Sequence, residues 1–147
     1  MVRNTGQTRG EASELEVALD LIDNGCRVSQ TFGHSHPYDL IADIDGRLVK
    51  VQVKTANTRD GANQHYIKLS NPNKYDAQNV DVFAGYAISE DKVFYVPYSE
   101  MGKRSSVTFT PLEKMGSDAN RDRANHISEY TFEAALPRTT CNKQDSS

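Results

Sequence analysis

The dipeptide Asp45-Gly46, set between two runs of alternating apolar and polar residues, constrains the fold of this 147-residue chain most strongly. Both residues can take a positive φ, and this pair is therefore favoured in two-residue hairpin turns. The flanking runs, 38–44 and 48–55, predict two antiparallel strands. The alternation fixes their register, because a slip of one residue would expose the whole apolar set: Leu40, Ala42, Ile44, Val49, Val51 and Val53.

The polar face of the predicted hairpin collects three side chains. With Ile44 facing Arg47 across the turn, counting back along an antiparallel ladder puts Asp39 opposite Gln52. Lys54 follows two residues later on the same face, diagonal to Asp39 and within reach of it. The sequence therefore predicts a patch with a carboxylate, an amide and a lysine. The alternative is an ordinary solvated strand face.

Segment 9–24 is predicted to be an amphipathic helix. Thr8 and Glu11 have the spacing of an N-terminal capping box, and Asn24-Gly25 is a C-terminal stop signal. At about 100° per residue, the apolar side chains share one broad arc that we expect to be buried: Leu15, Val17, Ala18, Leu19, Leu21 and Ile22.

Glu14 is predicted to lie on the buried side of that helix. A buried carboxylate needs a partner or a metal ion. If the helix packs on the edge of the hairpin sheet, Glu14 comes near Asp39 and completes a site with two carboxylates. Pairing with Arg9 or Arg27 is the alternative, and Glu11 replaces Glu14 as the candidate if the helix has a different phase.

The rest of the chain predicts an α/β fold with a mixed central sheet flanked by helices. Further strands are expected at 26–32, 65–70, 80–88, 93–97 and 107–110. A long loop is predicted at 115–125 and a short helix within 126–136. We expect a single domain over 1–136, followed by a disordered tail over 137–147.

Composition limits the cellular setting and the mode of binding. There is no apolar stretch of the roughly 20 residues that a membrane span needs, and Cys26 and Cys141 form no zinc or disulfide pattern, so a cytoplasmic protein without a membrane partner is expected. The net charge of -3 argues against DNA binding by bulk charge alone. However, acids concentrate on the first helix while bases flank the predicted patch: Arg3, Arg9, Lys50, Lys54, Arg59, Lys68 and Lys74.

The predicted patch suits a particular chemistry. Mg²⁺ prefers oxygen ligands and commonly takes one or two carboxylates, leaving positions for water and a substrate phosphate. Water activated by the metal can attack phosphorus. Lys54 would orient or deprotonate that water and offset charge that develops on the phosphate oxygens.

These residues also carry a resemblance. Asp39, followed after twelve residues by Gln52-Val53-Lys54 and preceded by Glu14 on a helix, resembles the PD-(D/E)XK nuclease superfamily. Pro37-Tyr38-Asp39 is similar to the Pro-Asp element with one residue inserted. Gln52 stands where the family usually has an acid, and the run Val-Gln-Val-Lys-Thr at 51–55 is similar to the cyanobacterial intron-encoded homing endonuclease branch.

The resemblance implies a restriction-endonuclease-like core and Mg²⁺-dependent hydrolysis of DNA phosphodiester bonds, with Mn²⁺ able to substitute. It also implies action as a homodimer or homotetramer. The catalytic groups would be Glu14, Asp39, Gln52 and Lys54, and the metal ligands Glu14, Asp39, Gln52 and Val53. A Holliday-junction resolvase and a nonenzymatic DNA-binding subunit with a degenerate site are the alternative functions.

Basic and aromatic residues around the motif are candidates for DNA contacts, because phosphate oxygens and grooves accept such side chains. Surface or loop roles would explain the same residues. The candidates are Arg9, His36, Lys50, Tyr66, Lys68, Lys74 and Tyr75.

Overall fold

The computed structural model of the chain describes residues 6–33, 36–60, 65–70, 75–101, 106–110 and 125–136. The predicted tail at 137–147, nearly all of the predicted loop at 115–125, and Lys74 lie outside the described residues. The tail, the loop and the single-domain assignment therefore stay predictions. Among the described helices, none combines the length and the apolar character needed to cross a membrane.

Helix α1 (Gly6–Asp23) begins three residues before the predicted start and ends where the stop signal placed it. Thr8 lies inside the helix, so the predicted capping box does not start it. At the other end Gly25 has φ +90°. The N–H of Cys26 donates to the Leu21 carbonyl oxygen at 3.0 Å, which is the Schellman arrangement expected beyond a helix.

The buried face of α1 is narrower than the predicted arc. Val17 and Leu21 are fully buried, whereas Leu15, Leu19 and Ile22 are 70%, 55% and 55% exposed. The prediction that the whole arc is buried was therefore wrong. The sheet contacts the helix along one stripe, while Leu15, Leu19 and Ile22 lie on the side of the helix turned away from that stripe and remain in solvent.

The central sheet is mixed, as predicted. Its strands are joined in the order β1 (Arg27–Gln30), β2 (Leu40–Ile44), β3 (Arg47–Asp60), β5 (Val82–Ala87) and β6 (Lys92–Pro97). The β3–β5 pair is parallel and the other pairs are antiparallel. The far end of β3 continues into a second branch with β4 (His65–Ser70), β7 (Ser106–Thr110) and β8 (Asn125–His126).

The hairpin has the predicted register. Ile44 pairs with Arg47 and Leu40 with Val51, and the turn residues Asp45 and Gly46 have φ +55° and +94°. The β2–β3 ladder ends at the Leu40–Val51 pair, while β3 continues beside β5 as far as Ala56. The two hairpin strands therefore part at Asp39.

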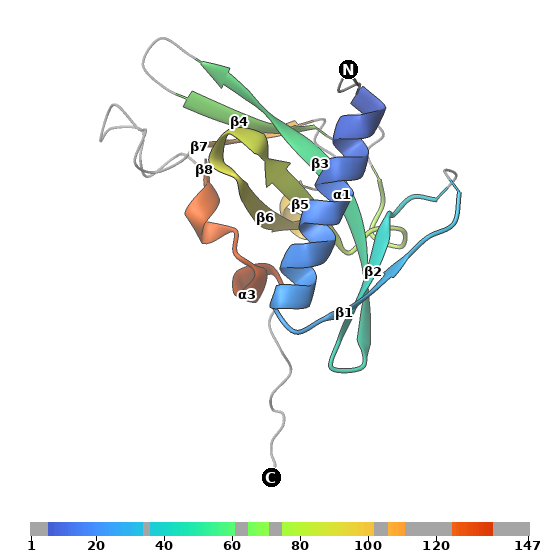
Figure 1. Cartoon of the computed structure of the whole chain (residues 1–147). Coiled ribbons are helices and arrows are strands. Elements are labelled where there is room, and N and C mark those ends of the chain that lie inside the picture. The colour runs from blue at the N-terminus through green and yellow to red at the C-terminus, as the bar shows by residue number, and fades with distance from the viewer. Residues whose placement is uncertain are drawn as a thin grey trace.

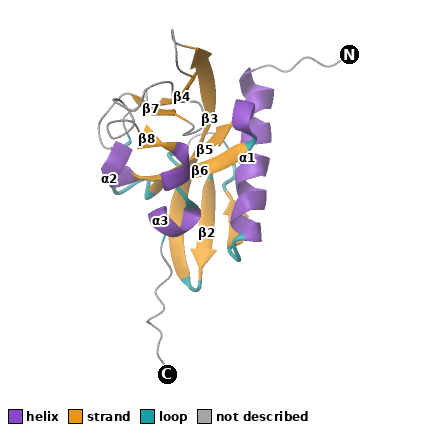
Figure 2. Cartoon of the chain, turned by 90° about the vertical axis from the view of Figure 1, so that its left-hand side faces the viewer, coloured by secondary structure: helices purple, strands orange, loops and turns teal. Residues whose placement is uncertain are grey.

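Helices cover both faces of the sheet (Figures 1 and 2). Helix α1 packs on one face and the short α2 (Tyr98–Met101) lies on the other. Short elements complete the set: η1 (Ile88–Glu90), η4 (Ile127–Glu129) and α3 (Phe132–Ala135). The core beneath α1 contains odd-numbered β3 residues such as Val51 and Val53, whereas the core on the other face contains Ala56 and Phe83.

Side-chain hydrogen bonds tie α1 to strands β3 and β6. The hydroxyls of Ser13 and Thr55 are 2.6 Å apart, and Ser13 is buried. Near the other end of the helix, the Tyr95 hydroxyl donates to Asp20 at 2.6 Å, and burial with this bond raises the pKa of Tyr95. The helix is therefore fixed relative to β3 and β6.

Candidate active site

A hollow of about 330 Å³ opens between the N-terminal half of α1 and the segment that leads into β2. We call it the carboxylate pocket. Its described lining residues are Glu11, Glu14, Gln30, Thr31, Phe32, Gly33, His36, Tyr38 and Asp39. Glu14 and Asp39, which the sequence predicted to approach each other, line the same hollow.

Asp39 sits at the point where the hairpin strands part. Its backbone N–H donates to the Val51 carbonyl oxygen at 2.9 Å, and its carboxylate accepts from the Val53 N–H at 2.9 Å. Burial raises the pKa of the Asp39 carboxyl above its ordinary value, while the bond from Val53 and the charge of Lys54 oppose part of that rise. The carboxylate is thus fixed to β3 through its side chain as well as its main chain.

Glu14 reaches the pocket from α1. It directly follows Ser13, whose hydroxyl pairs with Thr55, and Thr55 directly follows Lys54 on β3. The Gln30 side-chain amide donates to the Glu14 carboxylate at 3.5 Å. Glu11 lines the same pocket, so both helix carboxylates remain candidates.

Lys54 acts on the Asp39 carboxyl through its charge, and Gln52 lies between Val51 and Val53, the two β3 residues that bond to Asp39. Neither Gln52 nor Lys54 is among the described lining residues of the pocket. Gln52 is 8% exposed, and its Oε1 accepts no hydrogen bond from the part of the chain that the structure describes. Its Nε2 donates weakly to the Val53 carbonyl oxygen at 3.4 Å. The Lys54 ammonium nitrogen lies 5.2 Å from the centre of the Tyr75 ring. We call Gln52, Lys54 and Tyr75 the lysine cluster.

The side-chain oxygens of Asp39 and Gln52 suit a hard divalent cation, which prefers oxygen ligands. Among the described residues, no three acidic, histidine or cysteine side chains gather closely enough to hold a metal ion by themselves. A metal here would therefore need a different oxygen beside Asp39. Gln52 offers one, since a buried amide oxygen without a donor is costly unless something else binds it. Val53 offers its backbone carbonyl next to it.

The predicted DNA contacts lie in several places. Arg9 and His36 are exposed, His36 lines the carboxylate pocket, and the His36 ring forms a hydrogen bond with the Phe32 carbonyl oxygen. The Lys50 ammonium donates to the Gln78 carbonyl oxygen, so it already has a structural bond. Tyr66 and Lys68 belong to β4, whose backbone alone is described there.

Sequence reasoning did not find the β1 side of the pocket. Gln30 donates to Glu14, while the N–H and hydroxyl of Thr31 both donate to the Asp39 carbonyl oxygen at 3.4 Å. Phe32 is 95% exposed on the rim. The alternation of β1 predicted a strand, but no spacing in the sequence links it to Asp39.

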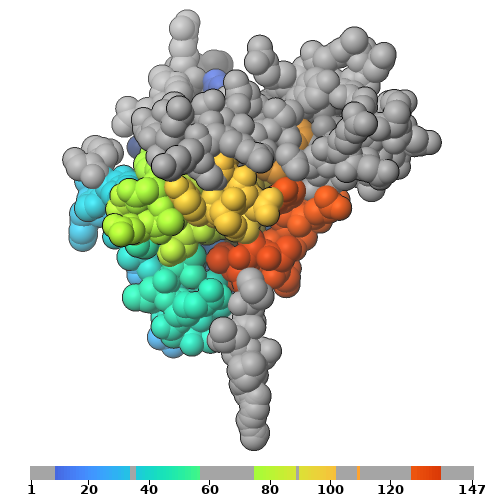
Figure 3. Space-filling model, turned by 180° about the vertical axis from the view of Figure 1, so that it is seen from behind, coloured from blue at the N-terminus to red at the C-terminus, as the bar shows by residue number. Residues whose placement is uncertain are grey.

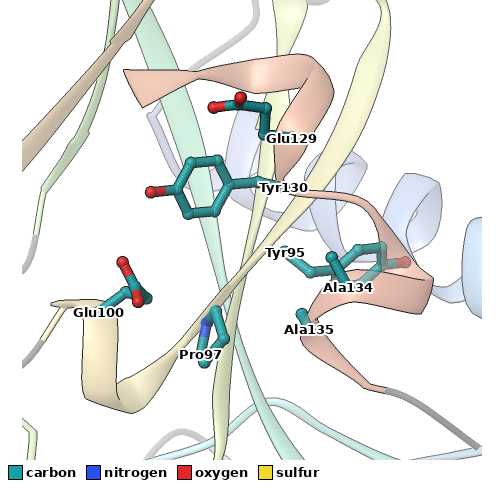
Figure 4. A pocket seen from close by; sticks show the side chains of 7 residues that line it. All are labelled: Tyr95, Pro97, Glu100, Glu129, Tyr130, Ala134 and Ala135. Atoms are coloured by element: carbon teal, nitrogen blue, oxygen red, sulfur yellow. The ribbon is translucent and has the colours of Figure 1, made fainter. Parts of the chain in front are cut away.

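A second hollow, of about 260 Å³, lies between β6, η4 and α3 (Figure 4). We call it the aromatic pocket. Its described lining residues are Tyr95, Pro97, Glu100, Glu129, Tyr130, Ala134 and Ala135. Glu100 and Glu129 are exposed and approach it from different elements.

Comparisons with known proteins identify the family and the fold of the chain. A family model described as PD-(D/E)XK endonuclease matches residues 4–133. The solved structure of a bacterial homing endonuclease, I-Ssp6803I, is similar with a TM-score of 0.67, at 18% identity, over 87% of this chain and 87% of that one. The restriction-endonuclease-like fold and the predicted resemblance are thereby confirmed. None of the curated proteins compared with the chain matches it.

Proposed function

The chain belongs to the PD-(D/E)XK endonuclease family, and from this premise we propose that it is a Mg²⁺-dependent DNA endonuclease of homing or mobile-element type. The observation that carries this proposal is the position of Asp39. Its partly buried carboxylate is bonded to the Val53 N–H and is influenced by the charge of Lys54. Gln52, which directly precedes Val53, has a buried side-chain oxygen that accepts no hydrogen bond from the described residues.

Nucleases of this family generally use divalent metal ions. Asp39, the Gln52 side-chain oxygen and the Val53 backbone carbonyl would hold Mg²⁺, with Glu14 or Glu11 contributing from α1. When bound, Mg²⁺ polarises a phosphoryl oxygen and lowers the pKa of water. Mn²⁺ prefers similar oxygen ligands and would substitute.

The chain's own residues supply the rest of the chemistry. Asp39 and Glu14 present negative charge to the pocket and orient the reacting groups there. Lys54 is held by strand β3 at the edge of the site, where its ammonium offsets charge that develops on the phosphate oxygens during attack. Because the β3 residues directly before Lys54, Gln52 and Val53, are buried, its backbone is fixed, and the charge is already near the site when the reaction begins.

The test is cleavage of two substrates by the purified full chain with Mg²⁺: plasmid DNA and a synthetic four-way junction. Cutting at one long plasmid sequence is the expected result. Cutting of junctions of any sequence would replace this proposal with a Holliday-junction resolvase. Binding without any cutting would replace it with a nonenzymatic subunit. In that case the site, with Gln52 in place of an acid, would have too little negative charge to hold the metal ion.

We also propose that the enzyme acts as a homodimer or homotetramer, so that both DNA strands are cut. Leu15, Leu19 and Ile22 support a second copy as the occupant of the outer face of α1. They recur at helical spacing and are largely exposed, which is unusual for a surface that stays in water. Light scattering should give more than the monomer mass, and Leu19→Glu should lower it. A monomeric wild type would contradict this proposal.

A further inference from the structure

The lysine cluster contains an interaction that the proposed reaction does not by itself require. The Lys54 ammonium nitrogen stands 5.2 Å from the centre of the Tyr75 ring, which is within the range of a cation–π contact. Tyr75 reaches it from a segment between β4 and β5 that is distant in sequence. In Figure 3 the described part of this segment lies on the face turned away from α1, beside the hairpin.

The Tyr75 ring is itself fixed by the core. Its centre lies 6.0 Å from that of Phe83, at an interplanar angle of 54°. Phe83 is fully buried and pairs in register with Gln52 in the parallel β3–β5 ladder. A rigid chain of contacts therefore runs from the core through Phe83 and Tyr75 to the Lys54 ammonium.

Lys54 needs such a support. A lysine side chain is a flexible four-carbon stem that ends in a compact charge, and it loses rotamer freedom only when something holds the end. Without the ring, the ammonium could swing into solvent or fold onto the Asp39 carboxylate, which would then be less able to bind a cation. With the ring, it stays on the sheet face that it shares with Gln52.

We propose that Tyr75 is a positioning residue, whose ring face holds the Lys54 ammonium in place for phosphodiester cleavage. This inference rests on the proposed function. It assigns Tyr75 a role different from a direct DNA contact, because a ring that supports Lys54 affects the rate of cleavage and a ring that packs against DNA affects affinity.

Tyr75→Leu and Tyr75→Phe separate the ring from the hydroxyl. Tyr75→Leu should lower the single-turnover cleavage rate by about 3- to 30-fold, the effect of losing one cation–π contact, with the DNA dissociation constant nearly unchanged. Tyr75→Phe keeps the ring face and should cleave at nearly the wild-type rate. Tyr98→Leu is the matched control, because Tyr98 packs against the same core and has no described contact with Lys54. It should lower stability without this change in rate.

A spectroscopic measurement tests the contact without catalysis. In the DNA-free protein, the ring current of Tyr75 should shift the Lys54 ε-methylene resonances upfield, a shift that Tyr75→Leu removes and Tyr75→Phe keeps. Unshifted Lys54 resonances in the wild type would overturn the inference. So would weaker DNA binding by Tyr75→Leu at an unchanged rate. A wild type that cuts no DNA would defeat the proposed function, while the Lys54 resonances would still decide the contact.

Discussion

The carboxylate pocket and the aromatic pocket are hollows of about 330 and 260 Å³, and acidic side chains line both. In the aromatic pocket, Glu100 and Glu129 are exposed and stand on short helices. In the carboxylate pocket, Asp39 is partly buried, is bonded to the backbone of β3, and has its pKa raised by burial. The carboxylate pocket is therefore the better candidate site, because the fold also supplies the charge of Lys54, which acts on Asp39, and the buried side-chain oxygen of Gln52.

The largest expected effect concerns Lys54. Lys54→Ala should lower the cleavage rate by about 100-fold or more, because it removes a fixed charge that stabilises the transition state. DNA affinity should change little, since one lysine contributes a small share of the phosphate contacts. Single-turnover cleavage and a gel-shift titration measure the two quantities. Lys92→Ala removes an exposed lysine at the start of β6 and should cut like the wild type. Equal rates for both variants would refute this role.

The next largest effect tests how α1 is held. Ser13→Ala removes the hydroxyl that pairs with Thr55, and it should lower the free energy of unfolding by about 1–2 kcal/mol. Denaturant titration measures this loss. Because the two hydroxyls share one bond, Ser13→Ala combined with Thr55→Val should cost less than the sum of the single changes. Ser29→Ala, on an exposed position of β1, should have almost no effect. A full sum would show that the pair is not coupled.

A smaller effect is expected at Gln52. Gln52→Glu adds a negative charge where the buried oxygen has no donor, and it should tighten Mg²⁺ binding about fivefold, which corresponds to about 1 kcal/mol. Calorimetric titration measures the affinity. Gln78→Glu, an exposed glutamine after β4, is the charge-matched control and should leave the affinity unchanged. Weaker Mg²⁺ binding by the Gln52 variant would remove this residue from the proposed ligand set.

The smallest effect is on stability at Asp39, because the opposing contributions to its pKa partly cancel. The pKa of its carboxyl is higher in the folded chain than the ordinary value of 3.8, so the folded state keeps the proton up to a higher pH than the unfolded state does. Stability therefore falls as pH rises through that window and stays lower above it. At pH 7, Asp39→Asn should unfold at a slightly higher temperature than the wild type. This difference in unfolding temperature should disappear as the pH falls below the ordinary pKa of 3.8.

Thermal unfolding across this pH range checks the Asp39 prediction. Asp23→Asn, at an exposed position of α1, should follow the wild type at every pH. If Asp39→Asn were less stable than the wild type at pH 7 and the gap widened with rising pH, the pKa of Asp39 would be lowered by folding rather than raised.

The hairpin could be predicted from the sequence because its signals are local. Turn chemistry at Asp45-Gly46 and the alternation of apolar residues together fixed the pairing of Leu40 with Val51. This register also brought Asp39 next to Val51 of β3, whose carbonyl oxygen accepts the Asp39 N–H. The ladder ends one pair earlier than predicted, and the Asp39 side chain binds the Val53 N–H rather than simply facing Gln52.

The parts that depend on packing could not be predicted. The apolar arc of α1 is wider than the stripe that the sheet covers, and nothing local tells the buried Val17 from the exposed Leu19. The partnership of Ser13 with Thr55 joins residues 42 positions apart. Gln30 likewise meets Glu14 only because β1 returns along the edge of the sheet.

The most direct test of the account compares the two hollows in one cleavage experiment. Wild type, Asp39→Ala and Glu129→Ala would be incubated with plasmid DNA and Mg²⁺ after equal folding has been verified by circular dichroism. The account predicts that the Glu129 variant cuts at the wild-type rate and that the Asp39 variant cuts about 100-fold more slowly or not at all. Loss of cutting in the Glu129 variant, with full activity in the Asp39 variant, would contradict it.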